Sequence, residues 1–209
     1  MKMNAQNKKL VMAFSIAIAV LVIVAGCGLT IFEVYYKVND SKPVRFLAKT
    51  FDLPAARVGK YKVSFDRFVK TRDAVMHFIN SDAGKEVKAA MPPQNVLDKN
   101  VLDRLLRQLI VQEMADQKKV AVTDDEVKTV FADVVKAAAS STTPNVSEYL
   151  SNNYGWNEND FRSQVLLPAL LEQKVGMELA KEMPTDQNAL ETAITARRAS
   201  PDVVIYLKF

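Results

Sequence analysis

The chain has 209 residues, of which 28 are lysine or arginine and 24 are aspartate or glutamate. Every acidic residue follows Phe32, so the chain after this point is nearly neutral, and no basic stripe with interleaved aromatic residues indicates nucleic-acid binding. With a single cysteine, Cys27, and a single histidine, His77, the composition provides neither a disulfide nor a histidine metal cluster, and we expect no cofactor, no metal and no enzymatic activity.

A charge-free apolar run occupies residues 10–32, directly after Lys8 and Lys9. Its length of about 23 residues is enough for a helix to cross the hydrocarbon core of a bilayer. The run is also longer than the apolar part of an ordinary cleaved secretory signal. We therefore expect a single-pass transmembrane helix that anchors one extramembrane domain.

Two other interpretations of this run remain open. The first is a signal that is removed by cleavage. The second is a lipoprotein signal, because residues 24–27 resemble a lipobox that ends in a lipid-modified cysteine, here Cys27. Against lipidation, Val34, Tyr35 and Tyr36 continue the apolar stretch past the cysteine, where a lipoprotein has a polar tether. The two tyrosines also suit the aromatic belt at a membrane interface.

The basic arm before the run favours a cytoplasmic N-terminus and an extracytoplasmic domain on the cytoplasmic membrane, facing the periplasm or cell envelope. The lysines and arginines on the two sides of the run are nearly balanced in number, so this orientation depends on the likeness of arm and run to an uncleaved signal. We divide the chain into a cytoplasmic arm and anchor over residues 1–36, a connector over 37–54 and a helical domain over 55–209.

The connector is expected to contain a short helix over residues 44–51, which ends before Pro54. Residues 55–63 then alternate in polarity around Gly59. This alternation predicts two very short strands, or a strand and a turn, at the start of the domain.

A helix is predicted over residues 65–81, with Ser64 as its N-cap, because apolar residues recur there at helical spacing. His77 lies four residues after Asp73 on this helix, and we expect it to have a structural role. The Met-Pro-Pro sequence over residues 91–93 marks a boundary loop that no helix crosses.

The strongest helical pattern spans residues 96–118, whose apolar positions cover more than half of the helical circumference. A stripe of this width requires packing on two sides, so we expect this leucine-rich helix at the centre of the domain. Its apolar residues are Leu97, Val101, Leu102, Leu105, Leu106, Leu109, Ile110, Met114 and Ala115.

Capping patterns predict further helices in the second half of the domain. Thr123 and Glu126 have the spacing of a capping box, before a helix that ends at a low-complexity stretch over residues 137–144. A short helix is expected over residues 146–153, and Gly155 follows it as a C-terminal cap.

A second capping pattern, formed by Asn157 and Asp160, precedes a helical segment over residues 161–183. Pro168 lies inside this segment and lacks the backbone N–H that a helix interior requires. We therefore expect the helix to be kinked or split at this proline.

The last part of the chain is expected to contain one helix and one strand. Thr185 is predicted to cap a helix over residues 186–198. Residues 203–207 are rich in β-branched and aromatic side chains, and we expect them to pair with the Val58 or the Val63 region.

Methionine and aromatic side chains provide the remaining functional pattern. Some of them must belong to an ordinary core, and others are expected to line an adaptable apolar groove for extended or unfolded polypeptide, because methionine tolerates varied shapes. The pattern leaves open which residues have which role. The candidate client-binding residues are Met76, Phe131, Tyr149, Tyr154, Trp156, Phe161 and Met177.

Four segments follow one another in a distinctive order. They are residues 58–68 (VGKYKVSFDRF), 102–115 (LDRLLRQLIVQEMA), 122–127 (VTDDEV) and 155–162 (GWNENDFR). Their order and spacing resemble the N-terminal chaperone domain of the SurA family of bacterial foldases, which is also seen in PrsA and in membrane-anchored PpiD. The likeness covers about residues 55–183, most of the chain after the apolar run.

The resemblance implies a mainly α-helical fold, in which helices around the leucine-rich one form a cradle for extended peptide and terminal strands close the domain. Members that catalyse prolyl isomerisation carry a parvulin domain after this region. Here only residues 185–209 follow, without a histidine, so we expect no isomerase site.

The function that the resemblance implies is a non-catalytic, holdase-like chaperone for unfolded or newly translocated polypeptides, tethered to the membrane, with the translocon as a further candidate partner. The alternative is a structural subunit that docks stably on a translocon or envelope complex. Crosslinking to many unrelated clients would favour the chaperone, whereas a single stoichiometric partner would favour the subunit.

Overall fold

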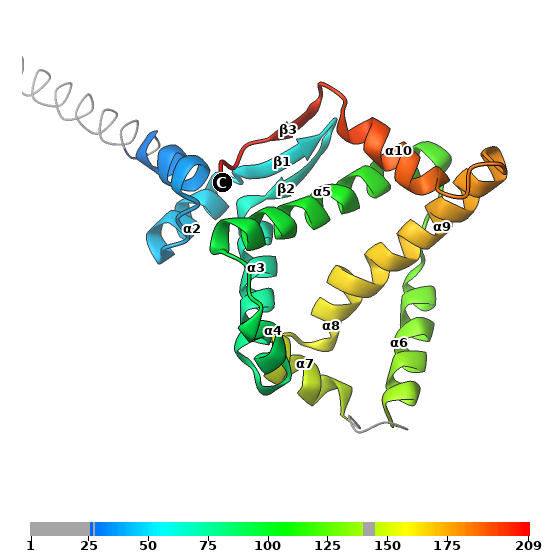
Figure 1. The fold of residues 1–209 in the computed structure, drawn as a ribbon, viewed down its shortest axis with the longest axis horizontal. Helices are drawn as coiled ribbons and strands as arrows, with labels where there is room; N and C mark the ends of the chain where they lie inside the picture. The colour runs from blue at the N-terminus through cyan, green and yellow to red at the C-terminus, as the bar shows by residue number, and fades with distance from the viewer. Residues whose placement is uncertain (1–25, 27, 140–144) are drawn as a thin grey trace, which may run out of the picture.

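The computed structural model describes residues 26, 28–139 and 145–209, which form a mainly α-helical fold with a few short strands, as expected (Figure 1). Most of the predicted membrane run, together with the candidate lipidation site Cys27, lies outside the described residues. Within the described ranges, no helix combines the length and the apolar character that crossing a membrane requires.

A three-stranded antiparallel sheet joins the beginning and the end of the domain. The central strand is β1 (Pro54–Val58), with β2 (Tyr61–Ser64) on one side and β3 (Val203–Ile205) on the other. Val203 of β3 lies opposite Val58 of β1. The predicted pairing of the C-terminal tail with the Val58 region is therefore confirmed.

The central helix is α5 (Gln94–Lys118), which packs against the sheet, α3 (Phe65–Asn80), α9 (Leu167–Glu182) and α10 (Ala189–Arg198) (Figure 1). Every apolar residue that the sequence placed on its wide stripe is buried. Contacts on several sides confirm that this helix forms the centre of the domain.

The main core also includes residues that precede the sheet. Val34 is fully buried in this core, and Ala48 of α2 (Lys42–Thr50) is buried beside it. The predicted short connector helix is thus confirmed as α2, which packs against α3. Part of the sequence expected to form the anchor and the connector is therefore packed into the domain.

α3 begins after Ser64, whose hydroxyl accepts a hydrogen bond from the Arg67 amide at 3.2 Å, as the sequence predicted. Two elements that the sequence analysis did not predict follow α3: the short helices η1 (Asp82–Gly84) and α4 (Lys85–Ala89). Both pack back against α3.

The capping box before α6 (Asp124–Ala139) is confirmed. The Thr123 amide donates to the Glu126 carboxylate at 2.8 Å, and the Glu126 amide donates to the Thr123 hydroxyl at 3.3 Å. α7 (Val146–Tyr154) ends at Gly155, which has a φ of +66° and therefore serves as the expected C-terminal cap.

The second capping box is also present, because Asn157 and Asp160 exchange side-chain and backbone hydrogen bonds at the start of α8 (Glu158–Phe161). A π-helical turn, η2 (Arg162–Leu166), separates α8 from α9, and Pro168 lies in the first turn of α9. The predicted split of this segment is confirmed, since a proline without an N–H is tolerated only near a helix start.

The predicted start of the last helix is wrong. α10 begins at Ala189, and Thr185 does not cap it. The Asp186 carboxylate instead accepts the Asn188 amide at 2.8 Å, and the Asp186 amide donates to the Met183 carbonyl. These local bonds form turns that compete with helix formation.

In space, α3, α5 and α9 form three sides of an open frame (Figure 1). α7 and α8 complete the corner between α3 and α9, and α6 lies along the outer side of the frame, where it contacts η2. A small second core of Val127, Phe131 and Leu166 holds α6 in this position.

Candidate binding crevice

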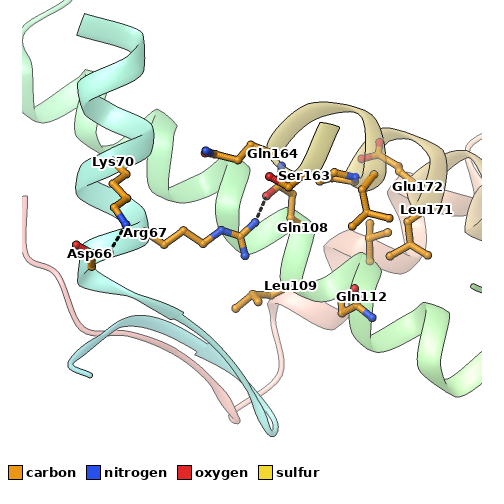
Figure 2. A pocket seen from close by; sticks show the side chains of 13 residues that line it. Asp66, Arg67, Lys70, Gln108, Leu109, Gln112, Ser163, Gln164, Leu171 and Glu172 are labelled. Carbon is orange, nitrogen blue, oxygen red and sulfur yellow. Dashed lines mark hydrogen bonds and ion pairs between the residues drawn. The ribbon is translucent and has the colours of Figure 1, made fainter. Parts of the chain in front are cut away.

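A cavity of about 400 Å³ lies between α3, α5 and the segment formed by η2 and α9 (Figure 2). Its volume is within the range of pockets that bind small ligands. Two further hollows, of about 50 and 330 Å³, share lining residues with it and extend toward α7. Gln164 of η2 lines all three, and we call the three together the crevice.

One wall of the crevice is apolar. Leu109 of α5 and Leu171 of α9 line it and are buried, while Leu167 lines it together with Pro168 and is partly exposed. These side chains come from two helices that the central packing of α5 holds together.

An aromatic stack closes the α7 end of the crevice. The Tyr154 ring stacks between Phe78, at 5.0 Å, and Trp156, at 5.3 Å between ring centroids. Tyr149 contacts Tyr154 in a tilted arrangement at 6.3 Å. Burial in this stack raises the pKa of the Tyr154 hydroxyl above its ordinary value.

The polar side of the crevice contains a guanidinium group without a carboxylate partner. Arg67 extends from α3 across the cavity and donates to the Gln108 side-chain oxygen at 2.9 Å (Figure 2). Burial lowers the pKa of Arg67, and no ion pair joins it to an acid in the described parts of the chain. The neighbouring Lys70, by contrast, is paired with Asp66 at 2.8 Å.

Two of the predicted client-binding residues, Tyr154 and Trp156, line the crevice, and Tyr149 contacts it through Tyr154. Met76 lies in a neighbouring hollow between α3 and α7. Met177 is half exposed on α9 and does not line the crevice.

The remaining two candidates, Phe131 and Phe161, pack together in the second core with ring centroids 6.3 Å apart. The Arg162 guanidinium lies over the Phe131 ring at 4.1 Å. The structure thus separates the candidate residues into a crevice group, a core group, Met76 in the neighbouring hollow and the exposed Met177. Their part in client binding stays a prediction.

The polar lining residues Arg67, Gln108 and Gln164 were not among those predicted from the sequence. Polar side chains on helices are ordinarily solvated, so nothing local distinguished these three from other surface positions. They come together only because α3, α5 and η2 meet in the folded chain.

His77 lies at the edge of the crevice, and its Nε2 atom is 3.0 Å from the Asn152 carbonyl oxygen. This contact joins α3 to α7, in keeping with a structural role. Over the described ranges, no cluster of histidine, cysteine, aspartate or glutamate side chains has an arrangement that could hold a metal ion.

The crevice is thus lined by apolar, aromatic and polar side chains from α3, α5, α7 and the segment formed by η2 and α9. A family model described as the SurA-like N-terminal domain matches residues 1–174, and the chain belongs to this family. In this family the domain is the non-catalytic, chaperone part of the protein. Comparisons with curated proteins and with solved structures gave no match.

Proposed function

We propose that this protein is a holdase-like chaperone, which binds an extended segment of unfolded or newly translocated polypeptide in the crevice and so prevents its aggregation. The observation that carries the proposal is the crevice itself, an open cavity with an apolar wall and an aromatic end in a domain of chaperone type. No catalytic step is needed for such a role.

The lining suits an extended polypeptide of varied sequence. An extended chain directs alternate side chains to opposite sides, so apolar ones can meet Leu109, Leu167 and Leu171 while the backbone faces the polar side. Gln108 and Gln164 have amide groups that can both donate to and accept from a peptide backbone. Backbone recognition with loose apolar contacts favours many clients over one.

The proposal includes a membrane tether. Its support is the uninterrupted apolar run over residues 10–32 behind a basic arm, which is long enough to span a bilayer. A tethered crevice outside the cytoplasmic membrane would meet polypeptides as they leave a translocon, while they are still unfolded.

Site-specific photo-crosslinking tests the crevice as the client site. A photoreactive residue at position 164, inside the crevice, is compared with one at position 173, since Gln173 is exposed on α9 and does not line the crevice. With the full chain in native membranes, position 164 should crosslink to many unrelated polypeptides and position 173 to few. Equal crosslinking at both positions would exclude the crevice.

The same experiment separates the chaperone from the structural subunit. A single stoichiometric partner at either position, instead of a spread of products, would favour stable docking. Trp156→Ala should reduce the suppression of client aggregation, whereas Val135→Ala, at an exposed apolar residue of α6 outside the crevice, should not. Both variants need a circular dichroism spectrum like that of the wild type.

A further inference from the structure

Arg67 has an unusual position among the cations around the crevice. Its side chain crosses from α3 toward α5 and lines both the main cavity and the hollow beside Tyr154 (Figure 2). A guanidinium is always charged at neutral pH and carries several N–H donors. Its one side-chain hydrogen bond within the described residues goes to a neutral amide, that of Gln108.

The acidic residues that line the crevice are already engaged with other groups. Each has a partner outside the Arg67 guanidinium: Asp66 pairs with Lys70, Asp73 with Arg45, Glu172 with Arg107, and Asp160 closes the capping box of α8. A partly desolvated cation without a counter-charge raises the free energy of the folded state. A carboxylate that enters the site would supply the missing counter-charge and lower this free energy.

The surroundings of Arg67 add donors and positive charge. Gln164 lies across the cavity, and its side chain forms no hydrogen bond with any of the described residues. Arg104 of α5 lines the hollow beside Tyr154 and is not in an ion pair within the same part of the chain. A carboxylate at this place could accept a forked pair of bonds from Arg67, which is the geometry that guanidinium groups favour.

We infer that Arg67 makes the crevice selective for a carboxylate on the bound polypeptide, so that an acidic segment with apolar flanks is preferred over its neutral counterpart. This inference rests on the proposed function, because it names the chemistry that the client site prefers. The carboxylate can come from an aspartate or glutamate side chain or from a chain terminus, and both present the same pair of oxygen atoms.

Fluorescence anisotropy with the full chain in lipid nanodiscs tests the inference with three labelled peptides of one apolar sequence. The first has a central glutamate and an amidated C-terminus, the second a glutamine and an amidated C-terminus, and the third a glutamine and a free C-terminus. The glutamate peptide should bind about tenfold more tightly than the neutral one, as expected for a charged hydrogen-bonded pair. Tight binding of the third peptide would assign the site to chain termini as well.

The preference should depend on Arg67. In Arg67→Gln the affinity ratio of the acidic to the neutral peptide should fall to about one, and Arg67→Lys should keep part of it, because lysine retains the charge but not the fork. Arg57→Gln is the matched control, since Arg57 is exposed on β1 and does not line the crevice. This control should keep the full ratio.

The outcomes distinguish this inference from the proposed function. If the wild type binds the neutral and acidic peptides equally, or if Arg67→Gln keeps the wild-type ratio, the inference is overturned while the chaperone role stands. If no peptide binds at all, both are overturned. Thermal melts of each variant establish that the lost preference is not a loss of fold.

Discussion

At the residue scale, Leu106 and Thr123 stabilise the domain by different means. Leu106 is fully buried in the main core, so Leu106→Ala should lower the free energy of unfolding by about 2–5 kcal/mol through the cavity it leaves. Thr123 caps α6 at an exposed position, and Thr123→Ala should cost only about 1 kcal/mol. Urea denaturation of both variants measures the two losses.

The ratio of these losses is the informative quantity. A larger loss for Leu106→Ala agrees with a leucine-rich helix packed on several sides. Equal losses would mean that α5 can rearrange to fill the missing volume, which would contradict its central position.

Substitution by alanine should lower the stability of the domain at one glycine, Gly84, and raise it at another, Gly176. A Cβ atom at Gly84 would lie 2.0 Å from the Phe78 carbonyl oxygen, so Gly84→Ala must displace the backbone where η1 approaches α3, at a cost of about 1–3 kcal/mol. At Gly176, inside α9, the nearest atom would be Leu190 Cδ2 at 3.5 Å, an ordinary contact. Gly176→Ala should therefore stabilise the domain by up to about 1 kcal/mol through helix propensity.

Thermal melts of the two alanine variants test this difference. Stabilisation by Gly84→Ala would show that the turn after α3 is not held against it. Destabilisation by Gly176→Ala would show that α9 and α10 lie closer together than the structure places them.

At the element scale, the position of α6 depends on contacts with η2 and α9. Its small core with η2 is supported at the N-terminal end by Lys174 of α9, which forms an ion pair with Glu126 at 2.6 Å and donates to the Ala121 carbonyl at 2.9 Å. The hydrogen bond from Lys174, followed by that from the Thr123 amide, lowers the pKa of Glu126 from its ordinary value of 4.5 to about 2.

This shift predicts how stability depends on pH. Because the pKa of Glu126 is lower in the folded than in the unfolded chain, its contribution is present above about pH 4.5 and is lost as the pH falls toward 2. In thermal melts, the wild type should have a higher melting temperature than Glu126→Gln at neutral pH, and the two melting temperatures should converge in acid. The effect should be small and weaker in salt, because the side chain is about two-fifths exposed.

A difference in melting temperature between wild type and Glu126→Gln that stays constant from neutral pH down to acid would contradict the lowered pKa of Glu126. The matched control is Asp125→Asn, because the Asp125 carboxylate pairs with Lys128 on the same helix and with no other element among the described residues. This variant should have little effect on the melting temperature at any pH.

At the scale of the whole molecule, the proposed membrane tether over the apolar run of residues 10–32 leads to a test of attachment and orientation. The full chain should resist carbonate extraction from membranes, and protease should digest its domain only from the outer face. Cys27→Ser should leave the attachment intact, because the proposed tether is the apolar run itself, whose length suffices to span a bilayer without a lipid.

Other results would change this assignment in specific ways. Release of the Cys27→Ser variant from the membrane would support the lipoprotein interpretation. Digestion of the domain by protease added on the cytoplasmic side would overturn the proposed orientation.

Much of the fold follows from local patterns in the sequence. The capping box of Thr123 and Glu126, the split before Pro168 and the wide stripe of α5 each depend on residues within a few turns of one another, so the sequence alone predicted them. The strand pairing of Val58 with Val203 was also expected, because few β-prone segments were present to pair.

The errors and omissions have a common physical cause. The start of α10 depended on which of several local hydrogen bonds Asp186 would form, and η1 and α4 depended on the close approach of Gly84 to Phe78. Such choices are decided by small free-energy differences that packing settles. The local sequence pattern therefore does not predict the start of α10 or the presence of η1 and α4.

The sequence by itself determined the helical class of the domain, its central helix and its family, because these depend on periodicity and on the order of motifs. Only the tertiary structure decided the crevice, since Arg67, Gln108 and Gln164 are distant in sequence and meet where α3, α5 and η2 pack together. It also divided the aromatic candidates, placing Trp156 in the crevice and Phe131 in a core. Whether one of these side chains is buried, and which residues it contacts, depends on neighbours from other helices. Only the folded chain brings these neighbours together.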